Sequence, residues 1–383
     1  MTTEKLYYEN CRLAVFTARV LACREREGGF AVLLDRTAFY PGGGGQACDT
    51  GTLGSSRVTG MAEENEEILH LCDRPLTPGE SVEGRIDWLP RFIRMQQHTG
   101  EHILSGLVHR KYGYHNTGFH MNLERIQVDF DGPIPVDALP ELESAVNDAV
   151  WQNLPVKCCV PGPEELGNLS YRTKRKLSWP VRIVEVPGFD MCACCGVHVA
   201  FTGEAGPVKL WSAVPFRGGT RIEMACGKLA LSYLNRVLES STQAGHVFSV
   251  PPEEVGTAAE AFSEQLAALK AHIVEVQRRN FAAIAREYEN AGNVLRFEPG
   301  LDSTGLRELC DTIVQSCGGR AAVFSGEDGQ GYGYCLAARQ EDLRGLGKEL
   351  TAKLDGRGGG KPNFQQGRVN AARAEIEAFF TER

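Results

Sequence analysis

The 383-residue sequence has no long apolar run, which argues against a membrane-spanning protein. No stretch approaches the roughly 20 uncharged apolar residues that a membrane helix needs. The start of the chain, Met1 to Lys5, lacks the basic-then-apolar pattern of a signal peptide. The sequence also has no internal repeat and no low-complexity tail. We therefore expect a soluble, cytoplasmic protein without a membrane partner, and its length predicts two or three domains.

A disulfide framework is also missing. The 13 cysteines are odd in number, and most stand singly in apolar runs, as Cys11, Cys72 and Cys226 do. Such cysteines are typical of small buried side chains rather than of a secreted, disulfide-linked scaffold. The exception is the run Cys192-Ala193-Cys194-Cys195, which lies just before a histidine and indicates a metal site.

The sequence has no overall excess of positive charge. Its net charge of −8 argues against broad nucleic-acid binding, because phosphate contacts need lysine and arginine. Two local basic clusters stand out, one at Arg85, Arg91 and Arg94, and a denser one at Arg172, Lys174, Arg175 and Lys176. Each cluster is either a solvated face or a local phosphate-binding surface.

The hydrophobic pattern predicts an α+β protein in four parts. Residues 1–88 form a β-barrel-like N-terminal module, residues 89–240 an α+β core that carries the histidine and cysteine motifs, residues 241–292 a long helical connector, and residues 293–383 an α/β C-terminal domain. The expected strands are Leu13–Phe16, Phe30–Leu34, Val58–Met61, Ile68–Leu71, Ile126–Phe130, Val181–Val186, Ala321–Phe324 and Tyr334–Ala338. The expected helices are Phe92–Gly113, Leu139–Gln152, Pro252–Asn290, Leu306–Gln315, Leu343–Leu354 and Arg368–Phe380.

The connector has a heptad-like stripe, with Phe262, Leu266, Leu269, Ile273 and Val276 spaced by alternating fours and threes. Two heptads are compatible with a short coiled coil or with a helix packed on its own protein. After it, the glycine-rich segment Gly356 to Pro362 is expected to be a loop whose exposed amides suit phosphate, with Arg357 and Lys361 beside them.

A pair of histidines carries the first half of a metal-site prediction. In Gln97-His98-Thr99-Gly100-Glu101-His102, the two histidines are four residues apart on a predicted helix, so they project from one face. A single metal ion can bridge them. The alternative is a helix that carries two unrelated histidines.

The second half lies about 90 residues further on. Cys194 and His198 are also four residues apart, and zinc accepts three nitrogens and one sulfur in a tetrahedral site. We therefore predict Zn²⁺ bound by His98, His102, Cys194 and His198. Cys194 is preferred because its four-residue spacing to His198 mirrors that of the histidine pair, but spacing does not exclude Cys192 or Cys195. A core role for these thiols is the alternative.

The zinc site is compatible with two roles. A closed four-ligand site is usually structural, whereas an open position would lower the pKa of a zinc-bound water to about 7 and polarise an ester carbonyl. Glu101, between the two histidines, is the candidate to take the proton of that water. The alternative for Glu101 is an exposed helix glutamate.

Several motifs together resemble the editing domain of alanyl-tRNA synthetase and the free-standing AlaX proteins. The glycine-rich segment Phe39 to Gln46 is similar to the entry segment of that family, and the histidine and cysteine motifs follow in the family's order. Further matching segments are Gly118 to His120, Tyr171 to Lys174 and Gly219 to Glu223. The segment Gly358 to Pro362 is similar to the DHH-associated C-terminal domain, which indicates the long AlaX type.

The resemblance implies a trans-editing hydrolase. Such a protein would use zinc to deacylate tRNA(Ala) mischarged with serine or glycine, an error that arises because a pocket sized for alanine discriminates poorly against either one. It also implies tRNA contacts, which we assign to Gly43, Gly44, Gly45, Gln46, Arg172, Lys174, Arg175, Arg221, Arg357 and Lys361. Whether the connector or the C-terminal domain forms a homodimer is left open.

Two departures from the family pattern bear on specificity. The family has Gly-Gly-Thr before the second-motif histidine, where this chain has Cys195-Gly196-Val197, so a hydroxyl contact to serine is in question. Many relatives have glutamine or threonine at the position of Glu101. That glutamate makes His98 to His102 fit the His-x-x-Glu-His pattern of inverted zinc peptidases, one rival interpretation. A zinc-stabilised tRNA-binding module without catalysis is the other.

Overall fold

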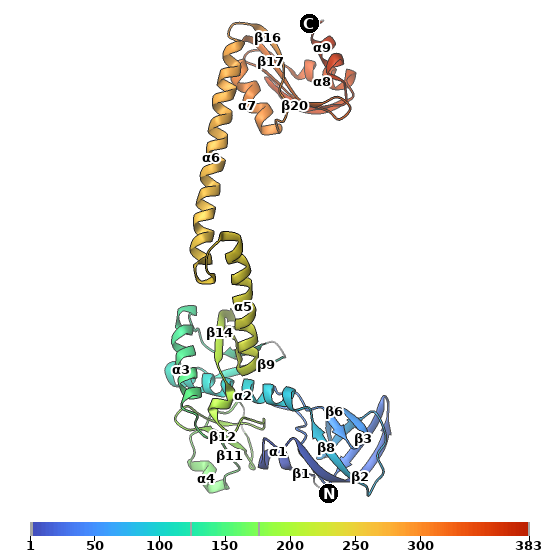
Figure 1. The fold of residues 1–383 in the computed structure, drawn as a ribbon, viewed down its shortest axis with the longest axis vertical. Coiled ribbons are helices and arrows are strands. Elements are labelled where there is room, and N and C mark those ends of the chain that lie inside the picture. The colour runs from blue at the N-terminus through green and yellow to red at the C-terminus, as the bar shows by residue number, and fades with distance from the viewer. Residues whose placement is uncertain (1–2, 123–124, 175–176, 382–383) are drawn as a thin grey trace. The chain divides into compact units, whose positions relative to one another are not determined.

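The computed structural model describes residues 3–122, 125–174 and 177–381 (Figure 1). The chain divides into two compact units, the first ending at Ala244 and the second beginning at Gly245. Both units combine helices with β-structure, arranged as several separate sheets in the first unit and one described sheet in the second, so the predicted α+β class is confirmed. Within the described ranges, no helix is long and apolar enough to cross a membrane.

The first unit begins with a small β-barrel. Six strands close it in the order β2-β3-β7-β6-β5-β8. Their bounds are β2 Val15–Arg26, β3 Gly29–Leu34, β5 Gly51–Leu53, β6 Ser56–Glu64, β7 Glu67–Cys72 and β8 Ser81–Ile86. The short strands β1 (Glu4–Lys5) and β4 (Arg36–Thr37) pair in parallel beside helix α1 (Leu6–Glu9). Alternating side chains fill the barrel, as Phe16, Ala18 and Val20 of β2 do.

His70 is a buried titratable group of this barrel. Its ring is hydrogen-bonded to the Thr37 hydroxyl (2.8 Å) and to the Val32 carbonyl oxygen (3.1 Å). Complete burial lowers the pKa of His70 from 6.5 to about 4, although the carbonyl partner acts in the opposite direction.

A pH-dependent stability follows from His70. The unfolded chain binds a proton at His70 that the folded chain does not, so the free energy of unfolding should fall as the pH falls from about 6.5 to 4. At about 1.4 kcal/mol per pKa unit, the loss is about 3 kcal/mol. All four tryptophans precede residue 245, so urea unfolding followed by tryptophan fluorescence reports on the first unit. In the variant His70→Gln, the free energy of unfolding should no longer fall in this way between pH 6.5 and 4, whereas the exposed control His272→Gln should keep the pH dependence of the wild type. The same pH dependence in both variants would contradict the assignment.

The rest of the first unit places two helices on a four-stranded sheet. Helix α2 (Trp88–Tyr112) ends at Gly113, whose left-handed backbone (φ 75°) closes the last turn. The sheet order is β14-β15-β10-β9, from β9 (Asn116–Met121), β10 (Ile126–Phe130), β14 (Val208–Phe216) and β15 (Gly219–Cys226). Apolar residues of α2 and of α3 (Leu139–Trp151) share one core with this sheet.

A smaller antiparallel sheet completes the region and carries the cysteine motif at its end. It has the order β11-β12-β13, from β11 (Lys157–Cys159), β12 (Ile183–Val186) and β13 (Asp190–Ala193). The remaining elements are α4 (Pro163–Asn168), the 3-10 turns Val136–Ala138 and Thr202–Ala205, and α5 (Gly227–Phe248), which runs across the boundary between the units. The sequence prediction did not include α5, β14 or β15.

Within the second unit, the turn Pro252–Glu254 leads into α6 (Val255–Glu287), the helix that the heptad-like stripe predicted. The five-stranded sheet of this unit has the order β16-β17-β18-β20-β19. The strands are β16 Gly292–Phe297, β17 Gly318–Glu327, β18 Gly331–Ala338, β19 Gly356–Lys361 and β20 Phe364–Val369. Helix α7 (Ser303–Val314) and the end of α6 pack on one face, and α8 (Arg344–Lys353) and α9 (Arg373–Thr381) on the other.

Two predictions in this unit were wrong. Gly356 to Lys361 is a strand rather than a loop, because it pairs along its whole length with β20. A side chain at Gly358 would overlap the Tyr334 hydroxyl, so glycine is required there within a strand. The expected helix Arg368–Phe380 begins only at Arg373, because Arg368 and Val369 complete β20.

Candidate metal centre

Helix α2 positions the first two candidate ligands. His98 and His102 lie one helical turn apart in a buried stretch of α2, and their ring centroids are 5.2 Å apart. His98 also stacks on Phe119 of β9, with 5.2 Å between the centroids. The helix and its packing therefore orient both rings.

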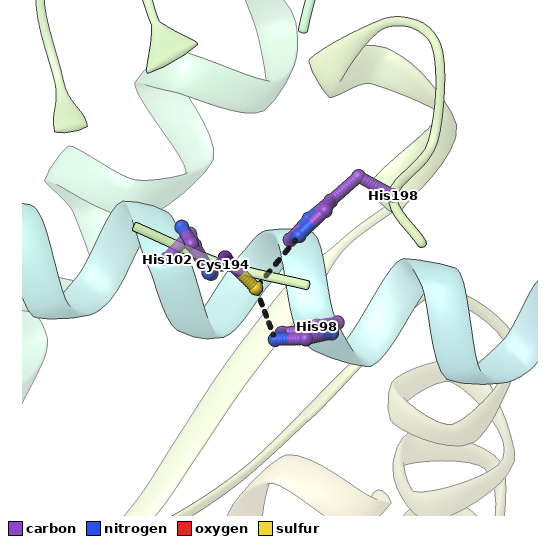
Figure 2. A group of neighbouring side chains, drawn as sticks. All are labelled: His98, His102, Cys194 and His198. Carbon is purple, nitrogen blue, oxygen red and sulfur yellow. Dashed lines mark hydrogen bonds between the residues drawn. The ribbon is translucent and has the colours of Figure 1, made fainter. Parts of the chain in front are cut away.

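The turn after β13 brings the second pair of residues to the same place. The His198 ring lies 4.4 Å from that of His98 and 4.6 Å from that of His102, between centroids. Figure 2 shows the Cys194 side chain among the three rings, with Sγ 3.5 Å from Nε2 of both His98 and His198. All four ligand atoms lie within 4.8 Å of one another, so the group could hold a metal ion.

The sulfur–nitrogen separation fits a tetrahedral zinc ion. With Zn–S about 2.3 Å and Zn–N about 2.0 Å, tetrahedral angles place sulfur and nitrogen about 3.5 Å apart. This is the separation of Cys194 Sγ from both His98 and His198. Three imidazoles and one thiol also form a donor set typical of zinc.

Glycine is required inside the turn that holds Cys194 and His198. A side chain at Gly196 would overlap the His98 ring. The neighbouring Val197 is buried and packs with Tyr7, Tyr40, Ile68 and Met95. Val197 stands where the family pattern has threonine, and its side chain points into the core.

Each histidine has a partner for Nδ1. Gln46 Oε1 accepts hydrogen bonds from the Val197 backbone N–H (3.1 Å) and from His98 Nδ1 (2.9 Å). The Thr99 hydroxyl lies 3.2 Å from His198 Nδ1, and Asp190 Oδ2 lies 3.0 Å from His102 Nδ1. With the three Nδ1 atoms engaged, Nε2 is the atom that each ring offers to an ion.

The protonation states at Cys194 and His198 suit metal binding. Burial alone would raise the pKa of the Cys194 thiol, but the charges of His98 and His102 lower this pKa well below its usual value. Burial, followed by the charges of His98 and His102, lowers the pKa of His198 well below 6.5. A thiolate and a neutral imidazole are the forms that coordinate zinc.

Glu101 is buried, so the alternative of an exposed helix glutamate is wrong. Its Oε1 accepts hydrogen bonds from the Ser105 hydroxyl (2.5 Å) and from the Asn116 amide. Its Oε2 lies 4.0 Å from Nε2 of His102. The carboxylate is thus held by one oxygen beside the candidate metal ligands.

The glycine-rich segment lies next to the cysteine motif. Gly43, Gly44 and Gly45 are exposed, and Cβ atoms added at Gly43 and Gly44 would lie 3.6 and 3.4 Å from the Cys195 sulfur. Cys195 therefore faces this segment, while Cys194 joins the histidines. Gln46 is buried against His98.

The basic residues that the sequence singled out have different surroundings. Arg172 makes a bidentate, largely buried ion pair with Asp190, and Arg221 makes one with Asp129. Lys174 is exposed, and Arg175 lies outside the described residues. In the second unit, Arg357 and Lys361 are exposed at the two ends of β19.

Sequence reasoning missed the residues behind the ligands. Asp190, Thr99, Ser105 and Asn116 each contact a ligand or Glu101 through the hydrogen bonds above. Ser105 follows Glu101 by four residues, a helical spacing that could have indicated this contact. Asp190 and Asn116 meet α2 only through the tertiary fold, so the sequence holds no local signal for them.

Comparisons with known proteins identify relatives of this chain and a family match that includes the cysteine motif. Residues 181–223, which include Cys194 and His198, match the threonyl and alanyl tRNA synthetase second additional domain. The alanyl-tRNA editing protein AlaX-L of Pyrococcus horikoshii is 29% identical, with 97% of this chain and 96% of AlaX-L aligned. The alanine–tRNA ligase of Pyrococcus abyssi is 30% identical over 98% of this chain. The chain spans only 43% of the length of that ligase. The editing protein Aarsd1 of Danio rerio is 24% identical over 98% of this chain and 96% of Aarsd1.

The fold and site therefore define an α+β protein that contains a synthetase-type second additional domain with a buried three-histidine, one-cysteine group. Along nearly its whole length, the chain is related to alanyl-tRNA editing proteins of the AlaX-L type and to alanyl-tRNA synthetases.

Proposed function

We propose that this protein is an aminoacyl-tRNA deacylase that removes wrongly attached amino acids from tRNA(Ala). The observation that carries the proposal is the convergence of His98, His102, Cys194 and His198 within a chain that aligns with 96% of an alanyl-tRNA editing protein. Serine, and also glycine, are the proposed amino acids, because a synthetase pocket sized for alanine discriminates poorly against either one.

The proposed cofactor is Zn²⁺, held by Nε2 of the three histidines and by Sγ of Cys194. A zinc ion there supplies Lewis-acid chemistry, since it polarises an ester carbonyl and makes water more acidic. Glu101 is proposed to receive the proton of the attacking water on Oε2, because Oε1 is held by Ser105 and Asn116. Burial of Glu101 and of the ligands keeps the surroundings of that proton poor in water.

The proposed tRNA contacts lie on exposed residues. Gly43 to Gly45 let the terminal nucleotide approach the backbone beside Cys195, and Lys174 supplies an exposed positive charge in the same unit. Arg221 remains a candidate, although Asp129 partly neutralises it. Arg357 and Lys361 are proposed as contacts made by the second unit, with glycines between them that admit a phosphate backbone.

Lys174 allows a direct test of electrostatic tRNA binding. The variant Lys174→Ala should weaken binding of tRNA(Ala) and reduce the slope of log K against log salt by about 1, because one fewer counterion is released. The exposed Lys270→Ala on α6 is the control and should leave the slope unchanged. A slope for Lys174→Ala equal to that of the wild type would remove this residue from the interface.

A second copy of the chain is the proposed partner of α6. The apolar stripe of α6 is 43–57% exposed, as expected for a helix that packs on a partner. It consists of Phe262, Leu266, Leu269, Ile273 and Val276. Sedimentation equilibrium should give a dimer mass, and a monomer at all concentrations would contradict this part.

Amino-acid release from purified tRNA(Ala) tests the proposed function. Seryl- and glycyl-tRNA(Ala) should be deacylated rapidly, and alanyl-tRNA(Ala) should be spared. The closed set of four ligands favours a second candidate, a zinc-stabilised tRNA-binding module without catalysis. Tight tRNA binding without release of any amino acid would support that module, and cleavage of peptides would support an inverted zinc peptidase.

A further inference from the structure

His102 differs from the other two histidines of the group in its Nδ1 partner. His98 is held by an amide oxygen and His198 by a hydroxyl, both neutral, whereas His102 is held by the carboxylate of Asp190. An ionised carboxylate only accepts hydrogen bonds, so the proton of a neutral His102 ring lies on Nδ1 and its lone pair on Nε2. The tautomer of this ligand is therefore set by Asp190.

Asp190 is in turn fixed by Arg172. Nε of Arg172 donates to Oδ1 at 2.6 Å, and its Nη2 donates to Oδ2 at 2.8 Å, so Oδ2 is shared between Arg172 and His102. The Asp190 side chain is 1% exposed and that of Arg172 is 12% exposed. A bidentate pair of this kind holds the carboxylate in one orientation and supplies the positive charge that its burial requires.

The backbone around this pair is arranged for close approach. Asp190 begins β13, and Cys194 directly follows the end of that strand, so one segment supplies both the carboxylate and the thiol. Arg172 is hydrogen-bonded alongside β13, through its N–H to the Met191 carbonyl (2.8 Å) and through its carbonyl from the Ala193 N–H (2.9 Å). On α2, a side chain at Gly106 would lie 2.8 Å from Cβ of Asp190, so glycine admits the strand one turn after His102.

We propose that the Arg172–Asp190 ion pair positions the metal centre, holding His102 with Nε2 directed at the ion, and that Arg172 serves this purpose rather than binding a tRNA phosphate. The inference rests on the proposed zinc centre. His102, Asp190 and Cys192 also form a close group that could hold an ion, but both oxygens of Asp190 face the Arg172 guanidinium, which opposes a second cation.

The test compares two ion pairs of the same geometry. The Arg221–Asp129 pair has the same 2.6 and 2.8 Å contacts, but within the described part of the chain none of the four candidate ligands is hydrogen-bonded to Asp129. Asp190→Asn should weaken zinc binding 10- to 100-fold in a chelator competition at fixed pH, whereas Asp129→Asn should leave it unchanged. The visible spectrum of the Co²⁺-substituted protein should shift in Asp190→Asn alone, because the ligand field at His102 changes.

The outcomes separate this inference from the metal centre itself. A wild-type protein that binds no zinc would contradict the proposed centre. If the wild type binds zinc but Asp190→Asn has the same zinc affinity and the same Co²⁺ spectrum, the positioning role alone would be overturned. If Asp190→Asn does not fold, Arg172→Gln is measured in the same way. Its zinc affinity is expected to lie between that of the wild type and that of a protein lacking His102. A zinc affinity equal to that of the wild type would overturn the proposal.

Discussion

Replacing Cys194 with alanine is expected to remove the bound zinc and to reduce seryl-tRNA(Ala) deacylation by more than about 100-fold. Loss of a single residue behind a metal ligand costs 10- to 100-fold in metal affinity or activity, and loss of a ligand should cost more. Cys194 is also the one thiol among the four candidate ligands, and the charges of His98 and His102 lower its pKa well below the usual thiol value despite burial. Metal content by mass spectrometry and initial deacylation rates measure both effects.

Cys195→Ala is the matched control. The two cysteines are adjacent, but Cys195 is exposed and its sulfur faces Gly43 and Gly44 instead of the histidines. The Cys195 variant should therefore keep one zinc ion per chain. Zinc lost from the Cys195 variant and retained in the Cys194 variant would reverse the assignment of the ligand.

Replacing Arg91 with methionine is expected to destabilise the first unit by about 3–5 kcal/mol. Arg91 and Asp49 are almost completely buried, and Arg91 Nε lies 2.8 Å from Asp49 Oδ2. Arg91 also donates to the Ala38 carbonyl (2.6 Å), which ties α2 to the segment before the glycine-rich loop. Removing the guanidinium leaves the carboxylate buried without its counter-charge, and that is the source of the large cost. Urea unfolding followed by tryptophan fluorescence measures it.

A double variant tests this explanation. Asp49 also accepts the Tyr40 backbone N–H (2.7 Å), so Asp49→Asn keeps an acceptor for that group while removing the charge. Arg91→Met with Asp49→Asn should recover part of the lost stability. A double variant as unstable as the single one would show that lost packing, rather than an unpaired charge, causes the effect.

The grouping of the four candidate ligands could be predicted from the sequence because each half of the group is set by local spacing. A four-residue spacing on a helix places His98 and His102 on one face, and the spacing of Cys194 and His198 suits a tight turn. The apolar period likewise predicted α2, α3 and α6 to within a few residues. Local spacing favoured Cys194 but could not exclude Cys195, because the choice between them depends on the direction of the turn after β13.

The supporting residues and several strands could not be predicted, for physical reasons. Asp190 reaches His102 only because Gly106 lets β13 approach α2, a contact that depends on the complete fold. The end of β2 extends beyond the barrel core and is rich in charged residues. The sequence there shows no alternation of apolar residues that would predict a strand. Strand β19 consists largely of glycine, which ordinarily indicates a turn.

The measurement that tests the central claim most directly is a zinc titration of protein stripped of metal by a chelator, with serine release from seryl-tRNA(Ala) as the readout. The stripped protein should be inactive, and its activity should rise linearly with added zinc and saturate at one ion per chain. The same titration of Cys194→Ala should give no activity. Stripped protein that deacylates at the full rate, or fully metallated protein that releases no serine, would contradict the account.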